Sequence, residues 1–417
     1  MLPIKQLLPK RSTKQSQFQK DQSNLIRNLN KTYQPIQFDK FNINPYPLLF
    51  SKELIYQVNG CHTLLIEAIH KIVSSFFDDP ILQEMISLND TVLNLLYPLR
   101  DKPYAIGAIR PDFLFNENYQ LKICEINTRF PLNAFLFSQC LYTEIHKNFG
   151  NNSFYFDREL LKISNIINNF FDSDRPISIL LNKEKSFDIC LLQNILEKIS
   201  NLTVKQISPF NNQQSDHVFQ TILNLHQEEL VCLDSDLFKE ITAQPYFNDI
   251  RTIFIVHDKR LLALLSNKKI MSKYISSEKC DQLANYIIPT YTLLNDHTVQ
   301  NIKMNPKNWV LKKSLTGKGK GMYIGKEAQF SEILTVLNEK KLDYVVQPFI
   351  NQPLFQLLNE ASSNSAAMPS SGYQNIYLVG SILSFNNILL GPGIIRGSCK
   401  SIINIAQGGT TVFMPIC

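Results

Sequence analysis

Three side chains with oxygen donors, Asp112, Glu125 and Asn127, lie close together in the segment 110–127. Two carboxylates and one amide carbonyl are hard ligands of the kind that Mg²⁺ prefers, and this ion usually leaves positions open for substrate phosphates. A structural zinc site would use Cys or His instead. The segment therefore predicts a site for Mg²⁺, or for Mn²⁺ as an alternative, that suits a metal-nucleotide complex.

The spacing within this segment predicts how the three side chains meet. Two β-rich runs, 105–115 and 121–126, flank a stretch of turn-forming residues. A hairpin of these runs brings Asp112 near Glu125, and Asn127, two residues further on, shares a strand face with Glu125. Taken alone, the pattern also fits an ordinary hairpin with a solvated acidic face.

A second pattern suited to phosphate lies near the C-terminal end. A short strand at 309–314 runs into Leu-Thr-Gly-Lys-Gly-Lys-Gly and then into a strand at 322–324. The glycines allow backbone amides to approach phosphate oxygens, and the lysines add positive charge. No helix follows directly, so this is neither a Walker A loop nor a Rossmann turn. The residues concerned are Gly317, Lys318, Gly319, Lys320 and Gly321.

Two further positions could contact a nucleotide. Gln347 lies in an apolar strand, Val-Val-Gln-Pro-Phe-Ile, where a polar side chain needs a partner that an adenine edge would supply. Lys268 begins a helix that Ser266 or Asn267 caps, and it could reach a phosphate. Simple solvation of Lys268 is the alternative.

The last motif places Arg396, Lys400 and Asn404 among β-branched residues. On alternating strands these side chains would point into a cleft. The guanidinium of Arg396 suits bidentate recognition of a carboxylate or phosphate, and a structural salt bridge is the alternative.

Composition excludes several classes of protein. The chain has 417 residues, 44% hydrophobic and 19% charged, which is typical of a globular protein of two or three domains. Eight scattered cysteines without a Cys-x-x-Cys pair favour a reducing, cytoplasmic location. No clustered histidines, Gly-x-Ser-x-Gly elbow or long uncharged apolar stretch supports a zinc hydrolase, a serine hydrolase or a transmembrane protein.

The net charge of +6 comes from the N-terminal leader. Residues 1–40 contain eight Lys or Arg and two Asp or Glu, which leaves 34 of each sign in the remainder. We interpret residues 1–45 as a basic, flexible or partly docked arm. Nucleic acid is not an expected partner because no aromatic residues alternate with these charges.

The rest of the chain divides into three regions. Residues 46–150 contain the hairpin between helical stretches at 54–77 and 133–148. Residues 151–260 alternate strands (177–181, 203–207, 230–234, 252–257) with a helix at 188–199, which predicts a small doubly wound α/β unit. Residues 261–417 contain the phosphate motifs and a low-complexity insert, 359–372, expected to be a mobile surface loop.

Together these motifs resemble the ATP-grasp superfamily of ATP-dependent carboxylate ligases. Arg-x-Asp-Phe followed by Glu-Ile-Asn-Thr-x-Phe-Pro resembles the metal segment of D-alanine:D-alanine ligase and of glutathionylspermidine synthase. Val-Leu-Lys followed by the glycine turn resembles the family's lysine strand and phosphate lid, Val-Val-Gln-Pro-Phe-Ile its adenine hinge, and 396–409 the strand pair before the metal segment.

The order of the motifs differs from that of the ordinary family. The metal segment usually comes last, whereas here Glu125 precedes Lys312. Joining the end near residue 417 to a start near residue 100 restores the usual order, so the resemblance implies a circularly permuted ATP-grasp fold, mixed α/β (α+β), with a small doubly wound pre-ATP-grasp domain. Glutathionylspermidine synthase and eukaryotic glutathione synthetase resemble this arrangement. The glycine turn is shorter than the glycine run of eukaryotic glutathione synthetase, and we expect no appended amidase-like domain before residue 46, so the substrates of these enzymes do not transfer.

The resemblance implies an ATP-dependent ligase that joins a carboxylate to an amine through an acylphosphate, using Mg²⁺-ATP and small-molecule substrates. The implied metal ligands are Asp112, Glu125 and Asn127; Lys268 and Lys312 contact the phosphates; Gln347 contacts adenine; and Arg110 contacts the oxyanion. Arg129 and Arg396 match positions near the transferred phosphate or the substrate carboxylate, and Lys400 and Asn404 are tentative substrate contacts. A phosphotransferase without ligation and a non-catalytic scaffold stay open as alternatives, and a homo-oligomer is compatible with the sequence.

Overall fold

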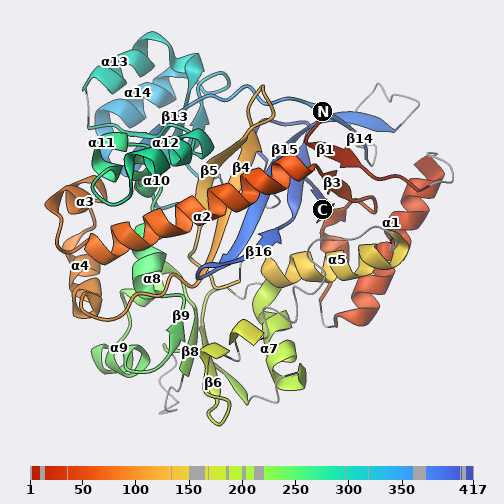
Figure 1. Ribbon diagram of the computed structural model, residues 1–417, viewed down its shortest axis with the longest axis horizontal. Helices are drawn as coiled ribbons and strands as arrows, with labels where there is room; N and C mark the ends of the chain where they lie inside the picture. Colours follow the sequence, from red (N-terminus) through yellow and green to blue (C-terminus); the bar gives the residue numbers. More distant parts are fainter. Residues whose placement is uncertain are drawn as a thin grey trace.

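A mixed α/β arrangement surrounds a central β-sheet in the computed structural model (Figure 1). The structure describes residues 2–9, 15–34, 36–132, 134–149, 165–167, 169–184, 187–199, 203–210, 220–294, 296–317, 319–359, 372–403, 405 and 410–416. None of the helices in these ranges is both long and apolar enough to cross a membrane.

The central sheet places the predicted hairpin at one edge. Its strand order is β2-β18-β17-β15-β4-β5, and β14 and β16 also pair with β15. Apart from the parallel β18–β2 pair, every pairing is antiparallel. The strands are β2 (Asn42–Ile43), β4 (Ala108–Phe115), β5 (Leu121–Asn127), β14 (Phe355–Leu358), β15 (Tyr373–Phe385), β16 (Ile388–Pro392), β17 (Ile395–Ser398) and β18 (Thr411–Phe413).

One face of this sheet is covered by the long helix α2 (Lys52–Ser75), which crosses β5, β15 and β16 in Figure 1. Ser51 caps the helix because its side chain accepts a hydrogen bond from the backbone N–H of Leu54. Apolar residues at helical spacing, including Leu54, Val58 and Leu65, are buried in the largest core cluster. The predicted helix at 54–77 is therefore confirmed with slightly different ends.

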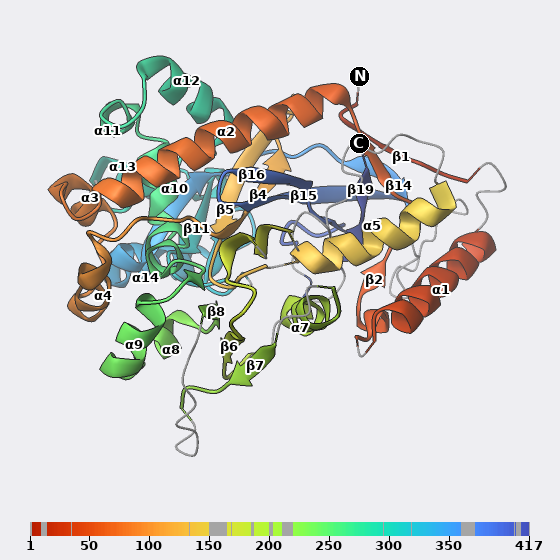
Figure 2. The same ribbon diagram turned by 60° about the horizontal axis from the view of Figure 1, so that its bottom comes forward.

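The N-terminal leader is folded in its described part, so of the two interpretations of residues 1–45 the partly docked arm fits the structure and the flexible arm does not. Strand β1 (Ile4–Gln6) pairs with β3 (Leu48–Phe50), which also pairs with β19 (Pro415–Ile416). Helix α1 (Gln15–Thr32) packs beside α5 (Phe135–Phe149), as Figures 1 and 2 show.

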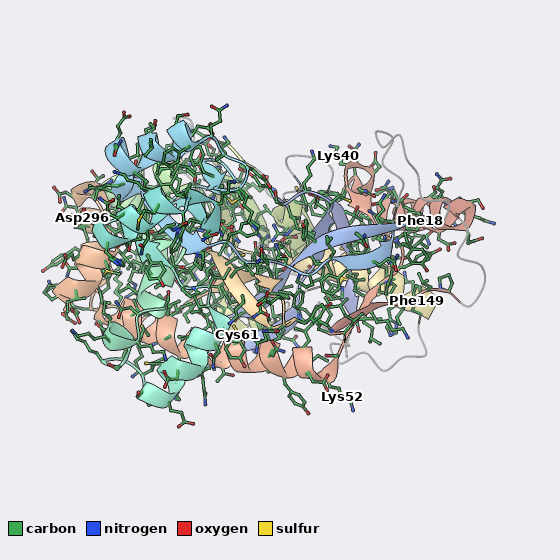
Figure 3. All side chains as sticks on the ribbon, turned by 90° about the horizontal axis from the view of Figure 1, so that it is seen from above. Phe18, Lys40, Lys52, Cys61, Phe149 and Asp296 are labelled. Atoms are coloured by element: carbon green, nitrogen blue, oxygen red, sulfur yellow. The ribbon has the colours of Figure 1, made fainter. Side chains whose placement is uncertain are left out.

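Helix α1 packs against the rest of the protein through few apolar residues. Its packing was therefore not predicted from the sequence. Phe18, Leu25 and Leu29 are buried on one face of an otherwise polar, Gln-rich helix. Spacings of seven and four residues place such side chains on one stripe. Figure 3 shows Phe18 and Phe149 at the same end of the molecule, opposite Asp296.

A four-stranded parallel sheet forms the small domain, in the order β7-β6-β8-β9. Its elements are β6 (Ile177–Leu181), α7 (Phe187–Ile199), β7 (Val204–Ile207), β8 (Gln220–Asn224), α8 (Gln227–Leu230), α9 (Ser235–Thr242) and β9 (Tyr246–Phe247). Parallel strands with a crossover helix are the predicted doubly wound pattern.

Two predicted strands of this domain are wrong. The run at 230–234 lies at and beyond the end of α8, and the run at 252–257 lies almost entirely in the π-helical turn η3 (Thr252–Val256). Every residue of η3 is buried. A short apolar run buried on all sides has no alternation, so the sequence cannot distinguish a strand from a helical turn there.

The predicted glycine hairpin is present in a four-stranded antiparallel sheet, in the order β10-β13-β11-β12. The strands are β10 (Tyr291–Thr292), β11 (Trp309–Lys313), β12 (Met322–Ile324) and β13 (Tyr344–Pro348), and α13 (Asp296–Met304) and α14 (Phe330–Glu339) lie in the same region. Of the insert 359–372, residues 360–371 lie outside the described part.

Short helices complete the fold. They are α3 (Pro80–Met85), α4 (Asp90–Leu96), α10 (Arg260–Leu265), α11 (Lys268–Met271), α12 (Ser277–Tyr286), and the 3₁₀ turns η1 (Phe38–Lys40), η2 (Tyr97–Leu99), η4 (Pro306–Asn308) and η5 (Lys341–Asp343). In Figure 1 the β4–β5 hairpin lies between the lobe that carries β13 and α14 and the small domain with β6 and β8.

Candidate active site

A cavity of about 500 Å³ brings most of the predicted site residues together. The hairpin, the β10–β13 sheet, the small domain and the segment after β16 all contribute to its wall. Predicted residues in the wall are Arg110, Asp112, Glu125, Asn127, Arg129, Lys312, Gly317, Gly319, Gln347 and Arg396.

The register of the β4–β5 hairpin explains why the side chains of Arg110, Asp112, Glu125 and Asn127 lie together. Asp112 pairs with Glu125 and Arg110 pairs with Asn127, so the four side chains form two adjacent cross-strand pairs. Asn248 fixes the base of the hairpin to the small domain, because its side chain bonds the backbone of Ala108 at 2.7 and 2.8 Å and the carbonyl of Thr128 at 2.9 Å.

Asp112 is a buried anion enclosed by donors. Its Oδ1 accepts a hydrogen bond from Arg110 Nε at 3.1 Å. Its Oδ2 accepts from Arg110 Nη2 at 3.2 Å, Arg396 Nη2 at 2.8 Å and Asn127 Nδ2 at 3.0 Å. Burial works against the charge of Arg396, but the adjacent Asp112 outweighs it and raises the pKa of that guanidinium. Asp112 thus fixes the side chains of two arginines in the wall of the cavity.

Glu125 keeps its negative charge in this setting. Burial would raise the pKa of its carboxyl, but Lys259, whose Nζ lies 3.1 Å from Oε1, and Lys312 outweigh burial and lower that pKa to about 2. About a quarter of the Glu125 side chain is exposed.

Lys259 was missed by the sequence analysis. It follows the run 252–257 that was interpreted as a strand, and no motif identified it. Its side chain is 6% exposed, and its Nζ donates to both Glu125 and the carbonyl of Thr316. Lys259 therefore connects the β4–β5 hairpin to the glycine turn.

The lysine strand and the glycine turn lie as the sequence predicted. Lys312 Nζ donates to the carbonyl of Cys124 at 3.2 Å, which leaves two of its three N–H groups for other acceptors. Gly319 and Gly321 have φ values of 71° and 69°, a conformation that glycine adopts without strain. Gly321 is not in the cavity wall, and Lys318 lies outside the described residues.

The argument that Gln347 needs a nucleotide as its partner does not hold, although the contact with adenine stays a prediction. The side chain is buried but already paired, because its amide nitrogen donates to Thr290 Oγ1 at 2.9 Å. Gln352, also in the cavity wall, has a buried Oε1 with no hydrogen-bond partner among the described residues. Gln352 lies in a loop between β13 and β14 with no strand pattern around it, so nothing in the sequence singled it out.

Two predicted side chains, those of Lys268 and Lys400, do not line the cavity. Lys268 is 60% exposed and forms an ion pair with Asp281 on the neighbouring helix α12. Lys400 is exposed and absent from the cavity wall, and Asn404 lies outside the described residues. The solvated interpretation of Lys268 therefore fits this structure.

Beyond the metal segment lie two donors without partners among the described residues. Arg129 stacks its guanidinium over the ring of Phe130, 4.7 Å from the centroid, and its buried Nε has no partner. His257 is 3% exposed; its Nδ1 accepts from the backbone N–H of Thr128 at 3.4 Å, and its Nε2 has no partner. Burial, with Lys259 and Arg129 nearby, lowers the His257 pKa to about 3, so the ring is neutral at pH 7.

The donor set of the hairpin fits a hard divalent cation in part. Among the described residues no three His, Cys, Asp or Glu side chains are grouped closely enough to hold a metal ion. Glu125 supplies a charged carboxylate, and Asn127 uses its amide N–H on Asp112, which leaves its carbonyl oxygen as an acceptor. One carboxylate and one carbonyl suit a Mg²⁺ ion that also binds substrate phosphates.

Comparisons with known proteins agree with this architecture. The AnkG N-terminal domain family matches residues 61–255. The ATP-grasp enzyme ankG of Aspergillus thermomutatus is 20% identical over 432 residues, which cover 88% of each chain. The apo structure of GSS30, a glutathione synthetase-like effector from Globodera pallida, superposes with a TM-score of 0.55 at 13% identity and 88% coverage of each chain. The chain is therefore similar to an ATP-grasp enzyme in sequence and has a glutathione synthetase-like ATP-grasp fold.

Proposed function

We propose that this protein is an ATP-dependent ligase that joins a small-molecule carboxylate to an amine and releases ADP and phosphate. The observation that carries the proposal is the convergence of Glu125, Asn127, Lys312 and the Arg110–Asp112–Arg396 cluster on one cavity of the ATP-grasp fold. Anion-binding cations beside a carboxylate–amide pair suit a metal-bound triphosphate rather than an apolar ligand.

Each group has a distinct task in the proposed site. Glu125 and Asn127 would hold Mg²⁺ or Mn²⁺, which supplies charge neutralisation to phosphate oxygens when bound. Among the described residues Lys312 Nζ has one hydrogen-bond acceptor, so two of its N–H groups can bind the phosphates, and backbone amides of the turn near Gly317 and Gly319 can approach the same oxygens. Gln352 Oε1 is an acceptor suited to the amino group of adenine or a ribose hydroxyl.

The reaction proceeds in two balanced steps. A carboxylate oxygen of the acid attacks the γ-phosphorus, a C–O–P linkage forms and ADP leaves. The amine then attacks the acyl carbon, the C–O bond to phosphate breaks, and phosphate departs with one oxygen of the acid while the amine loses a proton. Arg110 and Arg396, held by Asp112, would stabilise the negative charge that develops on oxygen in both steps.

Asp112 in this proposal positions the arginines rather than binding the ion. Both of its oxygens already accept hydrogen bonds, and three of the four come from guanidinium groups. A carboxylate neutralised in this way is a weak ligand for a cation. The resemblance implied a third ligand at this position, so this assignment differs from the family pattern.

We also propose that the fold is circularly permuted. The first and last described strands, β1 and β19, both pair with β3, so the two ends of the chain meet in one small sheet. Ends that meet at a surface are the arrangement that tolerates permutation. Strand β17 with Arg396 lies two strands from β4 with Asp112, although the two residues are far apart in sequence.

The test is ADP release by the purified protein with Mg²⁺-ATP and a panel of amino acids, dipeptides, other carboxylic acids and polyamines, with mass spectrometry of every positive reaction. We expect ADP together with a product that has lost one water. Phosphorylated product without condensation would identify a phosphotransferase instead. Glu125→Gln should abolish turnover. Glu117→Gln, an exposed change on the turn of the same hairpin, should not and serves as the control. ADP release that Glu125→Gln leaves unchanged would contradict the proposed metal-binding role of Glu125.

A further inference from the structure

The end of the cavity next to the small domain has an aromatic wall. Phe41, Phe137 and Phe187 come from the leader, α5 and α7, and all three line the cavity. Their ring centroids lie 4.9 Å (41–137), 5.4 Å (41–187) and 5.0 Å (137–187) apart, with tilted or edge-to-face geometry. Phe137 is almost fully buried, whereas Phe41 and Phe187 are half-buried, so their rings are only partly covered by the protein itself.

At this end of the cavity, two hydrogen-bond donors have no partner among the described residues. The backbone N–H of Thr128 lies 3.4 Å from His257 Nδ1, and a neutral ring that accepts this hydrogen bond carries its proton on Nε2. Nε2–H of His257 and Nε–H of Arg129 are both buried in residues that line the cavity, and neither has an acceptor among the described residues. A buried N–H without an acceptor is costly, so such a pair is expected to have a partner when the site is filled.

The carboxylates at the same end are already engaged. Asp188 accepts hydrogen bonds from the backbone N–H groups of Phe135 and Phe137, both at 2.9 Å, where α5 begins. Glu184 Oε2 lies 3.2 Å from His226 Nε2. Both carboxylates therefore already have partners within the protein, whereas the two N–H groups have no acceptor among the described residues.

The donor Arg129 lies next to the residues that are proposed to hold the metal ion. Glu125, Asn127 and Arg129 are two residues apart in sequence and all line the cavity, as alternate residues of an extended segment do. A carboxylate bound at Arg129 thus lies next along the same face from the residues proposed to hold the ion.

Building on the proposed ligase activity, we infer that the acid substrate carries an aromatic ring. Its carboxylate accepts hydrogen bonds from His257 Nε2–H and Arg129 Nε–H, and its ring packs against Phe41, Phe137 and Phe187. This makes His257 a substrate-binding residue and directs the search away from small polar amino acids, because a polar side chain would lose its water against this wall without gaining a partner.

The first experiment measures binding by isothermal titration calorimetry on the full chain, with Mg²⁺ and a non-hydrolysable ATP analogue present. The probes are benzoate, phenylacetate, 3-phenylpropanoate and indole-3-acetate, each compared with the amine of the same skeleton and an aliphatic acid of similar length. We expect at least one ring-bearing acid to bind about tenfold more tightly than both of its counterparts, since charge-assisted hydrogen bonds and ring burial each contribute on this scale. Equal or weaker binding of every ring-bearing acid overturns the inference.

Matched variants separate the two parts of the inference. His257→Met removes the donor at similar volume, whereas His257→Gln keeps an N–H group, so the affinity for the acid should fall about tenfold in the first and less in the second. Phe187→Leu should weaken the ring-bearing acid but not its aliphatic counterpart. Phe77→Leu alters a half-buried ring outside the cavity wall and serves as the control. Equal effects of His257→Met on the acid and the amine would contradict carboxylate recognition.

Failure of this inference is distinguishable from failure of the proposed function. The nucleotide analogue is titrated alone before the acids. If it binds and no ring-bearing acid is preferred, the substrate class is wrong and the ligase proposal is untouched. If it does not bind but a ring-bearing acid does, the subsite stands and the ATP-dependent function falls.

Discussion

Replacing Asp112 with Asn tests whether this residue mainly holds the two arginines. The substitution keeps the shape of the side chain but removes the negative charge and turns one oxygen into an N–H donor that faces other donors. Four hydrogen bonds from Arg110, Arg396 and Asn127 converge on the carboxylate, whose side chain is 4% exposed. The change therefore leaves two guanidinium groups near the cavity without their counter-ion.

The expected cost follows from this burial. Removing one partner of a buried ion pair costs about 3–5 kcal/mol of unfolding free energy. At about 2.1 cal/mol/K per residue, a chain of 417 residues has an unfolding entropy of about 0.9 kcal/mol/K, so Tm should fall by about 3–6 °C. The assay is thermal and urea unfolding in buffer without divalent cations. Asp281→Asn, which breaks the exposed pair with Lys268, should cost about 0–1 kcal/mol and serves as the control.

A metal-ligand role for Asp112 would predict the opposite change in Tm. If Asp112 belonged chiefly to a cation site, its charge would repel Glu125 when no cation is present, and Asp112→Asn would leave Tm unchanged or raise it. A stability at or above that of the wild type in cation-free buffer would thus refute the positioning role. A loss of several degrees that added Mg²⁺ does not alter would support it.

Two further predictions concern the folded leader and a buried histidine. Phe38→Ala should lower the free energy of unfolding by about 3–5 kcal/mol in urea titrations, because the ring is fully buried against Phe137 and Phe187; a change near zero would mean that the leader does not dock in solution. Burial lowers the His62 pKa from 6.5 to about 4, so the unfolded chain binds the extra proton as pH falls below 6.5, and this residue should remove about 2 kcal/mol of stability between pH 7 and 5. His62→Gln should reduce the pH dependence by that amount in urea titrations at the two pH values, and an unaltered pH dependence would show that His62 takes up its proton equally in the folded and the unfolded chain.

The sequence predicted the parts of the fold that have a clear periodicity. Strands β4 and β5 alternate around a turn, and β11 and β12 flank three glycines, so both hairpins were predicted within a few residues of their ends. The buried turn η3 has no alternation and was mistaken for a strand. Helix α1 docks through few apolar residues on a polar background, so its packing depends on α5 and could not be inferred from its own composition.

The candidate site was predictable where neighbouring residues carry the chemistry and not where the fold brings distant ones together. Glu125 and Asn127 share a strand face, which local spacing determines. Lys259 and His257 reach the hairpin through the π-helical turn, and Gln352 reaches the cavity from a loop, so their positions depend on tertiary structure. Lys268 had the expected helix-start pattern, yet it faces Asp281 on α12.

The central claim is that the acid is activated by phosphorylation before the amine attacks. The most direct measurement supplies the acid with ¹⁸O in its carboxylate, together with Mg²⁺-ATP and the amine, and determines the isotope content of the released phosphate by mass spectrometry. The acylphosphate route predicts that each phosphate carries one oxygen from the acid and that ADP accompanies it in equal amount. Phosphate without ¹⁸O, or label found in AMP, would contradict the proposed mechanism.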